Sequence, residues 1–181
     1  MGTANLCNFK YDYDKKDLLN RIHKLLPLIG TRLVRDDPES NTGGQDCWRI
    51  RIDSHLDYYD CQHIYNVCQP IWETFGCLDH HIRIQHYTPV SFLGWHYDWP
   101  KDSGITKVNL LLTEPRSFED KEGNKYEFDT AIVDATRFEH RWDNRGYPHR
   151  TFIRIGLQDI QYTDAVKKLK ELNYEIKNTY C

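Results

Sequence analysis

The hydrophobic period of the chain changes near residue 81, and this change constrains the fold more than any other feature of the sequence. Apolar residues before it recur every three or four positions, whereas segments 81–87, 107–112 and 150–155 have the alternating or continuous apolar pattern of strands. Segment 47–52 is an earlier strand of the same kind. Short strands separated by turn signals predict an antiparallel sandwich or barrel. Strands and helices do not alternate, so a doubly wound nucleotide-binding fold is disfavoured.

Two helices are predicted ahead of these strands. Residues 14–26 place their leucines on one stripe, with an aspartate at the N-cap position and Pro27 near the end. Residues 57–75 carry a second stripe that ends at Gly76, a residue suited to the left-handed conformation of a helix cap. Pro70 lies inside this second pattern, so the helix is expected to kink or split there.

Length and spacing indicate one domain. A chain of 181 residues can bury roughly 70% of its unfolded surface around a single core. We expect a helical N-terminal part over about 1–76, a β core over about 81–158 and a C-terminal helix over about 163–173, capped by Thr163. No repeat or linker divides the sequence, so 1–181 is expected to fold as one unit.

Composition and charge exclude several functions. The chain is 39% hydrophobic and 28% charged, which is typical of a globular protein rather than a disordered one. Its formal net charge of −3 gives no general attraction to nucleic acid, and no apolar window is long enough to cross a bilayer. We therefore expect no membrane partner, disfavour a nucleic-acid partner and expect a cytoplasmic location. The cysteines form no CxxC pair and are expected to be reduced thiols, at positions 7, 47, 61, 68, 77 and 181.

Two potential metal ligands stand at the end of a predicted strand. Alternate residues of a strand share a face, so His96 and Asp98 are expected to reach one point. His140 follows 44 residues after His96 and can supply a third ligand. Two neutral imidazoles and one carboxylate form the facial triad that suits Fe(II) and leaves three coordination positions open for chemistry. The set contains no cysteine, which argues against structural zinc.

A single arginine is placed to complete this set. Arg150 stands ten residues after His140, at the start of the predicted strand 150–155. A guanidinium is a planar, permanently charged fork that fits a carboxylate, so Arg150 is expected to hold the far end of a dicarboxylate. Inside a barrel without an anionic ligand it would be a buried charge without compensation. The alternative, that Arg150 faces solvent or pairs with an acid of the chain, stays open.

These residues resemble a known signature. His96 and Asp98, then His140, then Arg150 are similar to the HxD…H…R motif of iron(II)/2-oxoglutarate-dependent oxygenases. The stretch that ends at Arg150 is particularly similar to the branch of aspartyl/asparaginyl β-hydroxylases and small amino-acid (proline) hydroxylases, and the resemblance covers about 81–158. β-Hydroxylases proper often lack a carboxylate two residues after the first histidine. Asp98 supplies one, which moves the resemblance toward the proline-hydroxylase-like members and away from halogenating relatives.

The resemblance implies a mainly β fold with flanking helices and a double-stranded β-helix core, the jelly roll that cupins share. It implies that His96, Asp98 and His140 bind Fe(II) and that Arg150 grips the C5 carboxylate of the cosubstrate 2-oxoglutarate. With O2, such an enzyme hydroxylates an unactivated C–H bond of a small molecule or of an amino-acid or peptide side chain, and releases succinate and CO2. Three more side chains are expected to line the cosubstrate pocket: Asn109, Lys107 and Gln85.

Other functions and other residue roles stay open. A cupin-like module could bind a metal without catalysis, or could catalyse a redox-free isomerisation or hydrolysis. His149 competes with His140 as the third ligand, but an acid, Asp159, stands where the cosubstrate would need a cation. Two groups near the ligands fit either a structural role or substrate recognition: the basic residues Arg137, Arg141 and Arg145, and the aromatic residues Trp95, Tyr97, Trp99 and Trp142.

Overall fold

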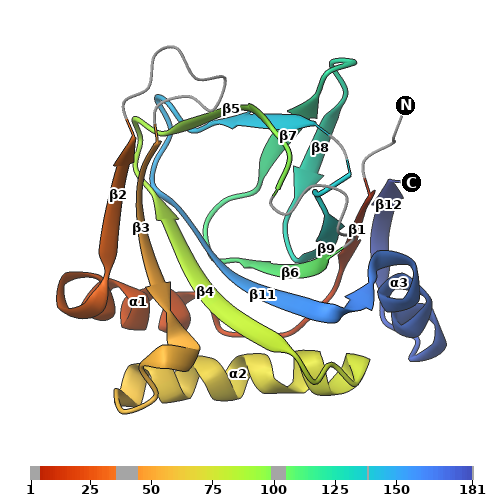
Figure 1. The fold of residues 1–181 in the computed structure, drawn as a ribbon, viewed down its shortest axis with the longest axis horizontal. Helices are drawn as coiled ribbons and strands as arrows, with labels where there is room; N and C mark the ends of the chain where they lie inside the picture. Colours follow the sequence, from red (N-terminus) through yellow and green to blue (C-terminus); the bar gives the residue numbers. More distant parts are fainter. Residues whose placement is uncertain (1–4, 36–44, 99–104, 138, 181) are drawn as a thin grey trace.

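The computed structural model describes residues 5–35, 45–98, 105–137 and 139–180. Their secondary structure is mainly β, with three α-helices (Figure 1). In chain order, the elements are β1 (Asn5–Phe9), α1 (Lys15–Ile29), β2 (Thr31–Arg35), β3 (Gln45–Arg51), a 3-10 turn (Ile52–Ser54), α2 (Tyr59–Phe75), β4 (His80–Tyr87), β5 (Phe92–His96), β6 (Ile105–Leu111), β7 (Arg116–Asp120), β8 (Lys125–Phe128), β9 (Ala131–Asp134), β10 (His140–Asp143), β11 (Arg150–Gln161), α3 (Tyr162–Glu171) and β12 (Ile176–Tyr180).

The strands form two antiparallel sheets that enclose a barrel. The larger sheet has the order β12-β1-β9-β6-β11-β4-β3-β2, and the smaller has the order β5-β10-β7-β8. From β4 to β11 the chain crosses repeatedly between the sheets: β4, β6, β9 and β11 belong to the larger, and β5, β7, β8 and β10 to the smaller. This crossing pattern is that of a jelly roll. The predicted fold class, mainly β with flanking helices, is confirmed.

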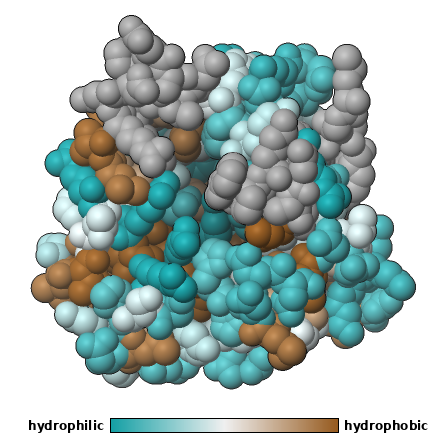
Figure 2. Space-filling view, in the orientation of Figure 1, coloured by the Kyte–Doolittle hydropathy of each residue, from teal (hydrophilic) through white to brown (hydrophobic). Residues whose placement is uncertain are grey.

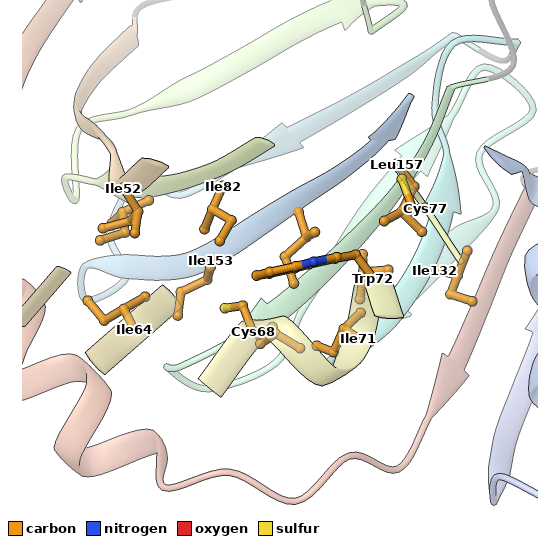
Figure 3. Packing of buried hydrophobic residues seen from close by; sticks show 14 of the residues in the cluster. Ile52, Ile64, Cys68, Ile71, Trp72, Cys77, Ile82, Ile132, Ile153 and Leu157 are labelled. Carbon is orange, nitrogen blue, oxygen red and sulfur yellow. The ribbon is translucent and has the colours of Figure 1, made fainter. Parts of the chain in front are cut away.

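Alternation along the strands gives the larger sheet two different faces. Ile84 of β4 and Ile153 of β11 are completely buried and pack with Cys68 and other apolar residues of α2, as Figure 3 shows for part of this cluster. The residue beside Ile153, Phe152, belongs to a second apolar cluster together with Phe118 of the smaller sheet. The helices therefore cover the outer face of the larger sheet, and the inner face looks into the barrel (Figure 1).

The two N-terminal helices are present, and each contains a proline. Asp14 caps α1, because its side chain accepts the backbone N–H of Asp17, as predicted. α1 includes Pro27 in its last turn, where one missing backbone donor costs little, and ends at Ile29, so Pro27 lies near its end as predicted. Of the two outcomes expected at Pro70, a split is not found: α2 is continuous, and buried residues on both sides of the proline pack against the sheet. Gly76 ends α2 at φ 66°, which confirms the predicted cap.

The ends of the chain contain strands that the periodicity did not indicate. The N-terminal part, over about 1–76, was expected to be helical apart from the strand at 47–52, yet it also contains β1 and β2. β1 lies between β9 and β12, so its partners are far away in sequence and leave no local signal. β11 is longer than predicted and leads directly into α3 at Tyr162. Thr163 is therefore not the cap of α3, whose N-cap position is Gln161.

The cysteines and the apolar character of the helices can be compared with the expectations from composition in the described part of the chain. Its five cysteines are buried thiols, whereas Cys181 lies outside the described residues. In that same part of the chain, no helix has the length and apolar character needed to cross a membrane.

The apolar face of β11 provides a stability prediction. Ile153→Ala should lower the free energy of unfolding by about 2–5 kcal/mol, because it leaves a cavity at a completely buried position between α2 and the sheet. Leu78→Ala, at a position that is 91% exposed, is the matched control and should change the free energy of unfolding by less than about 0.5 kcal/mol. Urea unfolding followed by circular dichroism measures both. Equal effects of the two substitutions would contradict this packing.

Candidate functional site

The three predicted metal ligands meet at one place in the barrel. His96 is the last residue of β5 and His140 is the first of β10, and the two pair across the smaller sheet. Asp98 lies two residues beyond β5, where its backbone N–H donates to the carbonyl of Ala135 at 2.9 Å. One ligand atom from each of the three lies within 4.8 Å of the others. The predicted convergence is found, although Asp98 joins it from the segment after the strand and not from the strand itself.

A hydrogen bond to the backbone of β5 orients the imidazole of His96. Its Nδ1 lies 2.7 Å from the carbonyl oxygen of Gly94, and because a carbonyl only accepts, Nδ1 carries the hydrogen. In the neutral imidazole, Nε2 would then carry the lone pair, and it lies 3.7 Å from Oδ1 of Asp98. Nε2 of His140 lies 3.9 Å from the same oxygen. The backbone of β5 therefore orients one imidazole so that three donor atoms surround a common point.

The second oxygen of Asp98 is held by two cations. Lys107 of β6 donates to Oδ2 at 2.6 Å, and Arg154 of β11 donates to the same oxygen at 3.4 Å. Burial alone would raise the pKa of Asp98, but Arg154 and Lys107, followed by the two histidines, hold it well below its ordinary value. Asp98 is thus an ionised carboxylate with one oxygen anchored to the larger sheet and the other turned toward the imidazoles.

This donor set fits Fe(II). His96, Asp98 and His140 provide two imidazoles and one carboxylate within reach of one ion, which is the ligand set of the facial triad that suits Fe(II). Asp98 would offset one of the two charges of a bound Fe(II). In the described part of the chain no thiol joins the cluster, so its chemistry differs from that of a closed zinc site.

Arg150 lies inside the barrel and has no acidic partner among the described residues. Its guanidinium lies 4.8 Å from the ring centroid of Phe128, 5.2 Å from that of Trp142 and 5.9 Å from that of Phe152. Only 4% of the residue is exposed, and its buried Nε has no hydrogen-bond partner among the described residues. Burial lowers its pKa to about 10, which nonetheless leaves it charged at pH 7. The alternative of a solvent-facing or acid-paired Arg150 is wrong for the described part of the chain. An anionic ligand would supply a counter-charge for the buried guanidinium of Arg150.

The three side chains expected to line the cosubstrate pocket all lie on the inner face of the larger sheet. Lys107 bonds to Asp98 as described. Asn109 accepts a hydrogen bond from Nε of Arg154 at 3.1 Å, and Gln85 accepts one from the hydroxyl of Tyr87 at 3.1 Å. Of the three, Lys107 is the one in direct contact with a proposed metal ligand.

His149 does not take part in the cluster of ligands. It stacks on His86 with ring centroids 4.7 Å apart, and His86 in turn bonds to the hydroxyl of Thr151. The metal-ligand cluster in the described residues contains His140 instead. The choice between the two histidines made from the spacing to Arg150 is supported by this geometry.

The other residues singled out in the sequence have structural contacts. Arg141 pairs with Glu119 and packs over the ring of Trp95, and Arg145 pairs with Asp143. Nε of Arg137 lies 3.5 Å from Oδ2 of Asp134. These arginines therefore form acid-paired positions rather than a free basic surface. Trp142 packs edge-on against Tyr87 between the sheets, and Trp99 lies outside the described residues.

The sequence analysis gave Arg154 no role, although the residue touches the proposed metal site. A signal was available: Arg154 alternates with isoleucines on β11, and Arg83 does the same on β4. A charged residue between two core positions of a sheet covered by helices must point into the barrel. The local pattern does not reveal which residue lies across the barrel from Arg154, so its contact with Asp98 could be identified only from the three-dimensional structure.

Comparisons with known proteins agree with this geometry at the level of the fold. The chain matches no protein-family model and no curated protein. A prolyl hydroxylase from Trichoplax adhaerens, in complex with a hypoxia inducible factor oxygen degradation domain peptide fragment, superposes with a TM-score of 0.64 at 12% identity, over 90% of this chain and 86% of that one. A non-heme alpha ketoglutarate dependent epimerase from nogalamycin biosynthesis gives 0.55 at 8% identity, over 83% and 75%. A Pseudomonas putida prolyl-4-hydroxylase gives 0.53 at 12% identity, over 84% and 91%.

The chain thus has the fold of prolyl hydroxylases and of other 2-oxoglutarate-dependent enzymes. The resemblance predicted from the HxD…H…R residues is confirmed for the fold. Low identity means that the roles of individual residues depend on the geometry of this chain.

The cluster makes a prediction about metal affinity. His140→Ala should weaken Co(II) binding by more than about 100-fold, because the loss of even an outer-shell partner of a metal ligand costs 10- to 100-fold. His149→Ala is the matched control, since it removes a histidine that stacks on His86 outside the cluster. Anaerobic calorimetry with Co(II) as the probe measures both affinities. Loss of affinity in the His149 variant instead would place the site elsewhere.

Proposed function

We propose that this protein is an Fe(II)- and 2-oxoglutarate-dependent dioxygenase that hydroxylates a C–H bond. The observation that carries the proposal is Arg150, a guanidinium buried in the same barrel as the His96, Asp98 and His140 cluster and lacking an acidic partner in the described chain. A metal-binding cupin module would explain the cluster but gives no reason for a buried, uncompensated cation. A cosubstrate with a free carboxylate accounts for both.

The proposed roles follow from the contacts. His96, Asp98 and His140 hold Fe(II), and Arg150 binds the distal carboxylate of 2-oxoglutarate. When bound, iron and cosubstrate together with O2 supply the oxidising power for hydroxylation and yield succinate and CO2. We propose that Asn109 and Gln85 line the cosubstrate pocket, since both lie on the inner face of the larger sheet.

The chain itself positions these groups and excludes water. Lys107 and Arg154 keep Asp98 ionised and direct one of its oxygens toward the imidazoles. Gly94 fixes the orientation of His96. The rings of Phe128, Trp142 and Phe152 surround Arg150, so a carboxylate bound there would be shielded from solvent and its ion pair strengthened.

The structural neighbours also support a proposed reaction, hydroxylation, and a proposed class of substrate. Two of the structural neighbours are named as prolyl hydroxylases, and one of them holds a peptide fragment. A protein of this fold can therefore bind a peptide segment at its site. We propose that the substrate of this protein is a small molecule or an amino-acid or peptide side chain. The epimerase neighbour shows that other outcomes exist on this fold.

Binding of the cosubstrate tests the proposal first. Anaerobic addition of Fe(II) and 2-oxoglutarate should produce the weak visible charge-transfer band of the iron chelate. With O2, succinate should form, and His96→Ala and Asp98→Ala should abolish it. A barrel that binds metal without this chemistry, or a redox-free isomerase or hydrolase, would give neither band nor succinate.

Arg150→Met separates cosubstrate binding from folding. We expect the KM for 2-oxoglutarate to rise by about 30-fold or more, because loss of one partner of a buried charge pair costs about 2–5 kcal/mol. The ligand-free variant should be at least as stable to heat as the wild type, since an apolar residue replaces an uncompensated buried charge. Succinate assays and thermal unfolding measure the two effects. A destabilised variant with unchanged KM would make Arg150 a structural residue.

A further inference from the structure

Three arginines form a row across the inner face of the larger sheet. Arg51 of β3 pairs directly with Arg83 of β4, and Arg83 pairs directly with Arg154 of β11. All three point away from the isoleucines that pack on the helices, so they share the face that looks into the barrel. Arg49 lies on the same face, two residues before Arg51. We call these four residues the guanidinium row.

The guanidinium row has more positive charge than its described neighbours neutralise. Arg51 pairs with Asp53 at 2.9 Å, and Arg154 reaches Asp98, whose oxygen Lys107 also binds. In the described chain, Arg83 forms no hydrogen bond or ion pair, and Asp53 is the acidic group that acts on it electrostatically. Like charges directly opposite one another on adjacent strands destabilise a sheet, so the guanidinium row lowers the stability of the larger sheet when no anion is bound.

Two further observations point to an absent anion. Nε of Arg49 is buried and has no hydrogen-bond partner in the described chain. Burial, and then the nearby Arg51, Arg49 and Arg154, lower the pKa of Arg83, and the opposing effect of Asp53 is smaller, which is expected where cations outnumber acidic groups. An oxyanion between these guanidiniums would supply the missing hydrogen bonds and offset the repulsion.

The guanidinium row ends at the proposed metal site. Arg154 belongs to the row and contacts Asp98, so a ligand bound along the row would lie beside the His96, Asp98 and His140 cluster. Adjacent strands are about 4.8 Å apart, so three strands span about 10 Å, the length of a single small molecule. Figure 2 shows hydrophilic residues around the hollow between the two sheets.

The guanidinium row differs from the position proposed for 2-oxoglutarate. Arg150 lies four residues before Arg154 on β11, about 13 Å along the strand, and aromatic rings enclose it. By contrast, Arg51 and Arg83 are exposed. The enclosed guanidinium suits one buried carboxylate, whereas the row suits a ligand that enters from solvent.

We propose that the guanidinium row binds the phosphate or carboxylate groups of the substrate, which is a small, multiply charged anion. This inference rests on the proposed function, because it places the C–H bond to be oxidised beside the metal cluster while the anionic groups lie along Arg154, Arg83 and Arg51. Phosphate and carboxylate share the required chemistry, namely oxygens that accept charge-assisted hydrogen bonds from guanidinium.

Binding of two simple probes to the metal-free full chain tests the guanidinium row. Tripolyphosphate and tricarballylate represent the two sources of anionic oxygen, and calorimetry at low and high salt measures their affinities. We expect one or both to bind, with an affinity that falls as salt rises. Arg83→Gln should weaken binding about tenfold or more. Arg145→Gln removes an exposed arginine that pairs with Asp143, and should leave the affinity unchanged.

The outcomes separate this inference from the proposed function. Tighter binding of tripolyphosphate indicates a phosphorylated substrate, and tighter binding of tricarballylate indicates a polycarboxylate. Two results would overturn the inference. One is that neither probe binds. The other is that Arg150→Met abolishes binding of the probes while Arg83→Gln leaves it intact. The charge-transfer band with Fe(II) and 2-oxoglutarate should persist in Arg83→Gln. If that band is absent in the wild type while Arg83-dependent probe binding is present, the oxygenase proposal fails and the anion site stands.

Discussion

Two-residue alternation along the central strands of the larger sheet is the constraint from which the rest of the structure follows. On β4 and β11, isoleucines pack beneath the helices, while the residues between them face the barrel. Burial of the isoleucines fixes the register, because a shift by one residue would place arginines against α2. The same register places Arg150 and Arg154 inside the barrel. The core that stabilises the fold thus also positions the cations of the site.

Much of this could be predicted from the sequence because the relevant patterns are local. The strand at 81–87, the cap at Gly76 and the spacing of His96, Asp98 and His140 each depend on neighbours in the chain. β1 could not be found in this way, since its partners β9 and β12 come more than a hundred residues later. The contacts of Lys107 and Arg154 with Asp98 depend on the closure of the barrel. Their presence on inward faces was predictable, but their common partner was not.

Asp98 connects the two halves of the barrel through charge. It follows β5 of the smaller sheet, yet one of its oxygens is held by residues of β6 and β11 in the larger sheet. Removing one partner of a buried ion pair costs more than the pair contributes, because the remaining charge is left without compensation. The cluster is therefore coupled to the closure of the two sheets, and a displacement of β11 would move Asp98 relative to the imidazoles.

The uncompensated cations explain why such a barrel would keep a polar interior at a cost to its stability. An apolar residue in place of Arg150 would suit an empty barrel better, since its buried guanidinium has no counter-charge in the described chain. Arg83 lies directly between Arg51 and Arg154 on adjacent strands, and the effect of Asp53 on it is smaller than that of these cations. The presence of Arg150 and Arg83 is most simply explained by ligands that bind the folded state and repay this cost on binding. Arg150 is enclosed by aromatic rings and Arg83 is open to solvent, so the two ligands must differ in how they enter. A deeply held cosubstrate and a second anion at the barrel entrance satisfy both requirements.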